Sequence, residues 1–152
     1  MREAVFVSYA RTGLAKAGRG GFNITPAMTM AAHAISSAVD KAGIEPEVVE
    51  DVALGNGAHG AANLGRLAGL LAGLPVTTGG NTIQRHCSSG LNSIAVAANY
   101  IKADGADCVV AGGVVLHDAL RSRSARDVCT YALPIVLMLL PHLLWRRLYY
   151  GS

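Results

Sequence analysis

The chain has 152 residues, which suits one ordinary domain and leaves little room for a second, and its 51% of hydrophobic residues is enough to bury a core. Its 13 Lys and Arg residues outnumber its 10 Asp and Glu residues, and the whole formal excess of +3 follows residue 113. A basic balance that comes from one terminal segment argues against a nucleic-acid-binding surface.

The first half of the sequence alternates predicted strands and helices. Val5 to Ala10 indicates a first strand, and a glycine-rich loop follows it. Thr25 is a candidate N-cap with Pro26 at the first helical position, and apolar residues at helical spacing continue to a stop at Gly43. Val48 to Gly55 then predicts a second strand that ends in a Gly-Asn-Gly turn.

The alternation continues to about residue 113. The leucines from Leu64 to Leu71 predict a short helix, and Thr82-Ile83 predicts a brief strand. Apolar residues from Leu91 to Ile101 fall at helical spacing and mark a second long helix. Asp107 to Gly113 has an apolar centre that suits a buried parallel strand. Strands that alternate with helices predict an α/β domain with a mostly parallel sheet.

Cysteine usage and apolar runs constrain the compartment. The three cysteines show no CxxC spacing and cannot pair completely, so neither a disulfide framework nor a metal site is expected. The run Val5 to Val7 is too short for the core of a signal peptide, so we expect a cytoplasmic protein. Ala132 to Trp145 is apolar but shorter than a membrane span and interrupted by prolines, so no membrane association is expected. A membrane-attached protein that uses this run is an alternative.

The composition changes abruptly near Val114. Of the 18 glycines, 17 precede that point, whereas four of the eight aromatic residues lie in the last 22 residues. Residues 115–152 could therefore be a linker with a small hydrophobic segment, or out-of-frame or artificial sequence. We expect the second, because the local and global signals disagree there. The predicted division is a domain over residues 1–114 and an unrelated tail over 115–152.

Cys87 is the main candidate for chemistry, because it lies in a predicted strand-to-helix turn. A helix N-terminus presents unpaired N–H groups and a positive dipole end, and both favour the thiolate that attacks carbonyls. The same N–H groups can stabilise the oxyanion formed in acyl transfer. The small residues Ser88, Ser89 and Gly90 leave room for a bulky thioester. From these residues alone, a nucleophile and a buried structural cysteine are both open.

The run Cys-Ser-Ser-Gly-Leu from Cys87, preceded by Gln-Arg-His, resembles the acyl-enzyme signature of the thiolase family. The similarity covers Met1 to Val114 and stops there. Other matching segments are Arg11-Thr12, Gly55-Asn56, Asn63 to Arg66, Ala72 to Pro75 and Ala111 to Val114.

The resemblance implies the N-terminal part of the layered thiolase fold, incomplete in this chain, with Cys87 as the catalytic nucleophile. It implies an acyl-CoA C-acyltransferase that cleaves 3-ketoacyl-CoA with CoA, or runs the reverse Claisen condensation, through an acyl thioester on Cys87. It implies no metal or redox cofactor, since CoA and acyl-CoA are substrates. It also implies a homo-oligomer for the full-length protein.

Thiolases are longer than this chain. Their later segments supply a CoA-binding loop domain, an Asn and a His for an oxyanion hole, and an acid/base cysteine. No residues here match those motifs, so the CoA-binding residues are unknown and the chain is expected to be an inactive fragment. Cys108 is predicted to be core, and His86 is predicted to point away from Cys87, because neighbours in an extended segment face opposite ways. His33 and His59 are predicted surface or loop residues, and Arg66 a structural one.

Two rivals remain. A ketoacyl synthase has the same fold, but synthases usually carry a serine at the position of Gly90. A non-catalytic thiolase-like protein would bind acyl-CoA or lipid, and the intact motif at Cys87 argues against it. A second active-site cysteine in later segments would identify a thiolase, and a histidine pair a synthase.

Overall fold

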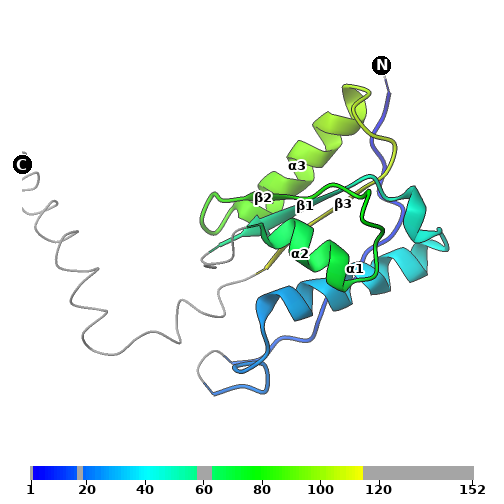
Figure 1. Cartoon of the computed structure of the whole chain (residues 1–152). Coiled ribbons are helices and arrows are strands. Elements are labelled where there is room, and N and C mark those ends of the chain that lie inside the picture. The colour runs from blue at the N-terminus through cyan, green and yellow to red at the C-terminus, as the bar shows by residue number, and fades with distance from the viewer. Residues whose placement is uncertain (1, 17–18, 58–62, 115–152) are drawn as a thin grey trace, which may run out of the picture.

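A computed structural model of the chain describes residues 2–16, 19–57 and 63–114 (Figure 1). Helices and strands alternate through the described part after an N-terminal segment without regular structure. In chain order the elements are α1 (Ala27–Ala42), the 3-10 helix η1 (Pro46–Val48), β1 (Asp51–Asn56), α2 (Leu64–Leu71), β2 (Asn81–Ile83), α3 (Ser89–Lys102) and β3 (Val109–Val114).

The strands form a three-stranded parallel sheet in the order β2-β1-β3. Gly55 of β1 lies opposite Ile83 of β2 and Gly113 of β3, so the carboxyl ends of all three strands meet at one edge. α1 and α2 pack together and cover one face of the sheet, whereas α3 packs against the other (Figure 1). The α/β class and the parallel sheet that the sequence predicts are therefore confirmed.

The core lies between the sheet and the α1–α2 layer. Val52 and Leu54 alternate along β1 and share one face, as the two-residue period of a strand requires. Leu64 of α2 and Ile35 of α1 pack against that face and are buried. The members of the buried cluster are Ala31, Ile35, Val39, Val49, Val52, Leu54, Leu64, Ala68 and Leu74.

Helix ends follow the sequence signals closely. α1 ends at Gly43, whose φ of 64° is a left-handed conformation that glycine adopts without steric penalty. Its N-cap is Pro26 and not the predicted Thr25, so the helix starts one residue later than expected. Asn63 caps α2, since its side-chain Oδ1 accepts a hydrogen bond from the Arg66 N–H at 3.1 Å. Such caps fix the residues at which the helices begin and end.

The predicted strand from Val5 to Ala10 is wrong. This segment takes no part in the described sheet, and its large apolar side chains, such as Phe6, are exposed. Its contacts run to α1 instead: Ser8 Oγ donates to the Ala38 carbonyl at 2.5 Å, and Lys41 Nζ lies 5.3 Å from the Tyr9 ring centroid. A strand needs a neighbour's backbone groups to bond to, and this segment pairs with no strand of the described sheet.

Two predicted strands need new boundaries. The second one begins at Asp51, because Pro46 starts a 3-10 turn that includes Val48. The last one runs over Val109–Val114 and is parallel as predicted, but five of its residues are only partly buried and Gly113 is exposed. β3 is an edge strand of the described sheet, and an edge has one neighbour fewer to cover it.

In the described ranges, no helix is long and apolar enough to cross a membrane. The run Ala132 to Trp145 and the whole predicted tail lie outside the described residues.

Candidate active site

Cys87 lies between the end of β2 at Ile83 and the start of α3 at Ser89, and it is exposed. This places it beyond the carboxyl edge of the parallel sheet. Ligands of open α/β sheets bind in the crevice outside the carboxyl ends of the strands. The predicted strand-to-helix turn is therefore confirmed, and the alternative of a buried structural cysteine is wrong.

Three glycines seat the first turn of α3 directly on the sheet. A Cβ added to Gly55 of β1 would lie 2.4 Å from the Ser89 carbonyl carbon and 2.5 Å from the Gly90 nitrogen. A Cβ added to Gly113 of β3 would lie 2.7 Å from the Gly90 Cα. Helix and strands thus meet backbone to backbone, with no room for a side chain between them. This contact was not predicted from the sequence, although glycines at both strand ends were a visible signal for a close approach.

Two buried serines tie α3 to the strand ends. The hydroxyl of Ser93 lies 2.5 Å from the Gly112 carbonyl oxygen of β3 and 2.7 Å from that of Gly90 in its own helix. The hydroxyl of Ser89 lies 3.1 Å from the Asn56 carbonyl oxygen at the end of β1. From the sequence, Ser89 was expected only to leave space beside Cys87, and this role was not predicted.

The turn that carries Cys87 is not extended. His86 has a φ of 49°, a left-handed conformation that costs an L-residue about 1–2 kcal/mol. The predicted reason for His86 to face away from Cys87, alternation along an extended segment, is therefore wrong. The turn closes where the Ser88 N–H donates to the Arg85 carbonyl at 3.1 Å, and Arg85 Nη1 donates to Asn92 Oδ1 at 2.9 Å.

The backbone N–H groups near Cys87 are only partly available for an oxyanion. The Ser88 N–H donates to the Arg85 carbonyl, and the Ser89 N–H donates to the His86 carbonyl at 3.2 Å. Those two groups were part of the predicted oxyanion-binding set, and the turn itself uses them. The positive end of the α3 dipole remains beside the thiol.

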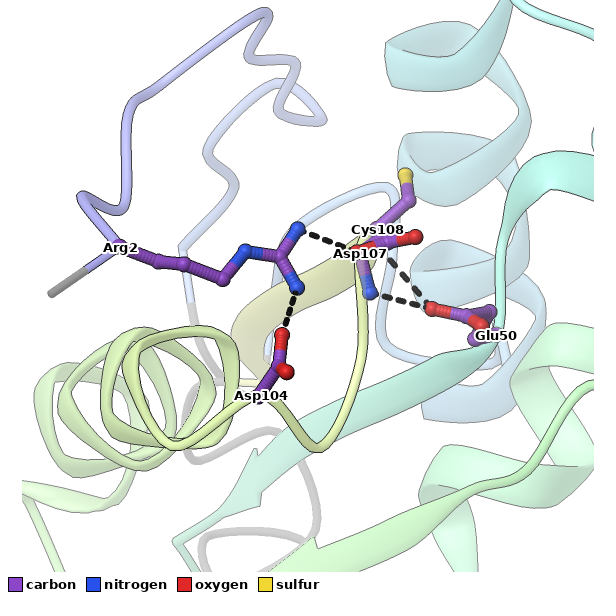
Figure 2. A network of polar contacts seen from close by, with 5 residues as sticks. All are labelled: Arg2, Glu50, Asp104, Asp107 and Cys108. Atoms are coloured by element: carbon purple, nitrogen blue, oxygen red, sulfur yellow. Dashed lines mark hydrogen bonds and ion pairs between the residues drawn. The ribbon is translucent and has the colours of Figure 1, made fainter.

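Cys108 has a different environment, shown in Figure 2. It precedes β3, is half-buried and packs against the core. The prediction that Cys108 is a core residue is therefore only partly correct. Glu50 Oε2 accepts hydrogen bonds from the Asp107 N–H and, at 3.4 Å, from the Cys108 N–H. The pKa of the Cys108 thiol is raised, mainly by burial and to a smaller extent by the negative charge of Glu50.

The same turn anchors the N-terminal segment. The Arg2 guanidinium pairs with Asp104 at 2.5 Å and with Asp107, both between α3 and β3 (Figure 2). All three side chains are largely exposed, so salt screens these pairs and each stabilises the fold little.

We expect iodoacetamide to alkylate Cys87 faster than Cys108 in the folded chain at neutral pH. Cys87 is exposed, whereas the raised pKa of Cys108 leaves less of it as the reactive thiolate. Cys108 should become reactive only as the pH rises further into the alkaline range, or when the chain is unfolded in urea. Peptide mapping after timed alkylation at several pH values measures both rates. Equal rates at neutral pH in a folded sample would contradict the expectation.

The remaining predicted residues lie away from Cys87 or outside the description. Arg66 is structural as predicted, since its guanidinium donates to the carbonyls of Val76, at 2.7 Å, and Thr78. His33 is exposed on α1, and His59 lies outside the described residues.

A cavity of about 350 Å³ opens at the opposite, amino-terminal edge of the sheet. Its lining residues are Asp51, Ala53, Asn81, Val96, Ala97, Tyr100 and Val109.

Comparison with known proteins identifies the family. The sequence model described as "Thiolase, N-terminal domain" matches residues 4–122, which is most of the chain. The chain belongs to the thiolase family. The family that the residues around Cys87 and the preceding segments resemble is therefore confirmed. The named relatives of this chain are enzymes, as the resemblance implied.

Curated thiolases cover the same region. The chain is 41% identical to an acetyl-CoA acetyltransferase of Cupriavidus necator over 74% of its length, and 38% identical to a 3-ketoacyl-CoA thiolase of Bacillus subtilis over 74%. The crystal structure of the Bacillus anthracis acetyl-CoA acetyltransferase superposes with a TM-score of 0.72 at 36% identity over 74% of the chain. The chain spans 29–30% of these three relatives, less than a third of each.

Proposed function

We propose that Cys87 is the nucleophile of a thiolase-type acyl-CoA C-acyltransferase. The observation that carries the proposal is the exposed thiol at the carboxyl edge of the sheet, beside the N-terminus of α3. The relatives that match this region are named acetyl-CoA acetyltransferase and 3-ketoacyl-CoA thiolase, which favours a thiolase over a ketoacyl synthase. A non-catalytic acyl-CoA-binding protein would have no use for an exposed thiol at this place.

The proposed reaction proceeds in two halves. The Cys87 thiolate attacks the ketone carbon of a 3-ketoacyl-CoA, the carbon–carbon bond breaks, and acetyl-CoA leaves after its carbanion takes up a proton. The thiolate of free CoA then attacks the acyl thioester, acyl-CoA leaves and the Cys87 thiolate is regenerated. Splitting the transfer through a covalent intermediate makes each half easier and gives ping-pong kinetics. CoA is a substrate, and no step uses a metal or an electron carrier.

The assembly, the location and the division of the sequence are separate from this proposal. A homo-oligomer of the full-length protein and a cytoplasmic location stay predictions, and named relatives also include mitochondrial proteins, such as that of Homo sapiens. The division of the sequence into a thiolase part at residues 1–114 and an unrelated tail at 115–152 stays a prediction as well.

The acylation half-reaction tests the proposal, because it needs only the nucleophile and a thioester. We expect the purified chain, incubated with acetyl-CoA, to gain one acetyl group on the peptide that contains Cys87 and to release CoA. Cys87→Ser should remove this acetylation, whereas the matched control Cys108→Ser should keep it. Acetylation at Cys108 alone, or none in a sample that circular dichroism shows to be folded, would contradict the nucleophile assignment.

A further inference from the structure

Two serines in the first turns of α3 are almost completely buried, and they make different contacts. Ser93, at 0% exposure, reaches the carbonyl oxygens of Gly90 in α3 and Gly112 in β3. Ser89, at 2% exposure, reaches the end of β1 at Asn56 and also the turn that carries Cys87. Of this pair, Ser89 is the one in contact with the Cys87 turn.

Ser89 holds that turn at two points. Its Oγ accepts a hydrogen bond from the Arg85 N–H at 2.8 Å, and it lies 2.6 Å from the His86 carbonyl oxygen, to which it can donate. The two bonds enclose the left-handed backbone of His86, with its φ of 49°. A residue stays in such a sparsely populated conformation only when its surroundings over-determine it. The Ser89 hydroxyl adds to that constraint from inside the protein, whereas the bond of the exposed Ser88 hydroxyl to the Arg85 carbonyl, at 2.8 Å, acts at the surface.

We propose that Ser89 is the positioning residue for Cys87. The proposal rests on the proposed function, since it names what places the acyl-carrying thiol. The single hydroxyl hydrogen is shared between the His86 carbonyl and, at 3.1 Å, the Asn56 carbonyl at the end of β1. The hydroxyl thereby links β1 to the Arg85–Cys87 turn, so that the thiol is held at the N-terminus of α3 rather than carried on a loose loop. Ser89 itself is not at the surface and does not touch substrate.

The chemical effect of this link is one of geometry. Well-oriented reacting groups gain a large part of their rate from fixed position, and a misplacement of about 1 Å costs about 100-fold. Without the Ser89 hydroxyl, the His86 backbone can relax out of its left-handed conformation, and the direction of the next residue changes with it. Cys87 would then remain exposed but lose its alignment with the helix N-terminus.

The test compares Ser89→Ala, Ser89→Thr and Ser93→Ala in the 152-residue chain. We expect Ser89→Ala to lower the rate of Cys87 acetylation by acetyl-CoA by at least about 10-fold. Its alkylation by iodoacetamide should fall by about 2- to 5-fold as the dipole contact is lost. Ser89→Thr keeps the hydroxyl and should restore both rates. Ser93→Ala removes an equally buried hydroxyl and should leave both rates unchanged in the folded fraction.

Cys108 alkylation in the same samples reports unfolding, because a globally loosened chain exposes that thiol. If Ser89→Ala unfolds, the rates are measured in trimethylamine N-oxide, which favours the folded state. A folded Ser89→Ala with unchanged Cys87 rates, or an equal loss in Ser93→Ala, overturns the positioning role. Absence of acetylation in every variant counts against the proposed function, and the iodoacetamide rates then decide the positioning role independently.

Discussion

Replacing Gly55 with alanine is expected to destabilise the described domain by about 3 kcal/mol or more, at the upper end of what overpacking costs. The new Cβ would lie 2.4–2.5 Å from backbone atoms of Ser89 and Gly90. Backbone atoms cannot swing aside as a flexible side chain can, so α3 must shift away from β1. Urea denaturation followed by circular dichroism measures the loss of unfolding free energy.

Gly112→Ala is the matched control, because it lies on β3 beside the equally crowded Gly113. A Cβ there would meet only Leu54 Cδ1, at an ordinary contact distance of 3.9 Å. We expect the free energy of unfolding to change by no more than about 1 kcal/mol, and glycine replacement at a compatible site can even stabilise. Equal effects of the two substitutions would show that α3 does not sit on β1 as closely as the distances indicate.

The second large effect concerns turnover. We expect the purified 152-residue chain to show no measurable thiolysis of acetoacetyl-CoA, even where Cys87 can be acetylated. The sequence contains no match to the acid/base cysteine or to the Asn and His of the oxyanion hole, and removal of one oxyanion-hole donor alone costs about 100- to 1,000-fold. Groups that act as a unit lose most of their effect when one is missing.

The absorbance of the acetoacetyl-CoA enolate gives a direct assay. Its decay should not depend on added CoA, and the trace for the chain should match that for Cys87→Ser. A CoA-dependent decay that disappears in Cys87→Ser would prove the expectation wrong and would mean that the chain is catalytically sufficient. Turnover and single acetylation are separate measurements, so the nucleophile assignment can stand when turnover is absent.

Local signals predicted the helices of this chain well. Gly43 stops α1 because a left-handed residue ends a helix, and the leucine spacing of α2 is visible without any tertiary information. The strand-to-helix turn at Cys87 was predictable for the same reason, since a brief strand signal precedes a long helical pattern.

Properties that depend on neighbours were not predictable. Val5 to Ala10 has a strand-like sequence, but whether it joins a sheet depends on a partner that its own residues do not encode. Cys108 was expected in the core, yet β3 is an edge strand of the described sheet, so the thiol is half-buried. The sequence pattern of a strand indicates which side chains can be buried. The position of the strand in the sheet decides how many of them are buried by neighbouring elements.

The turn that carries Cys87 was predictable from sequence, whereas the contacts that support this turn were missed. Cys87 stood out as a candidate because few residue types serve as nucleophiles. Ser89 was identified only as a small residue. The sequence does not distinguish a buried serine that holds a turn from an exposed serine beside a thiol. The left-handed His86 gave no sequence signal, because glycine is the usual residue there.

The backbone contact of Gly55 and Gly113 with Gly90 has a consequence for protein engineering. On the α1–α2 side, a cluster of hydrophobic side chains around Val52 and Leu64 lies between the helices and the sheet, and interchangeable hydrophobic residues there can absorb changes in volume. Gly65 of α2 is the exception, since a Cβ added there would lie 2.2 Å from the Asn81 carbonyl oxygen. The first turn of α3 has no side chains between it and the strand ends, so a library of core substitutions should concentrate its tolerated members around Val52 and Leu64. Substitutions on the α1–α2 face would leave the position of Cys87 relative to the sheet unchanged.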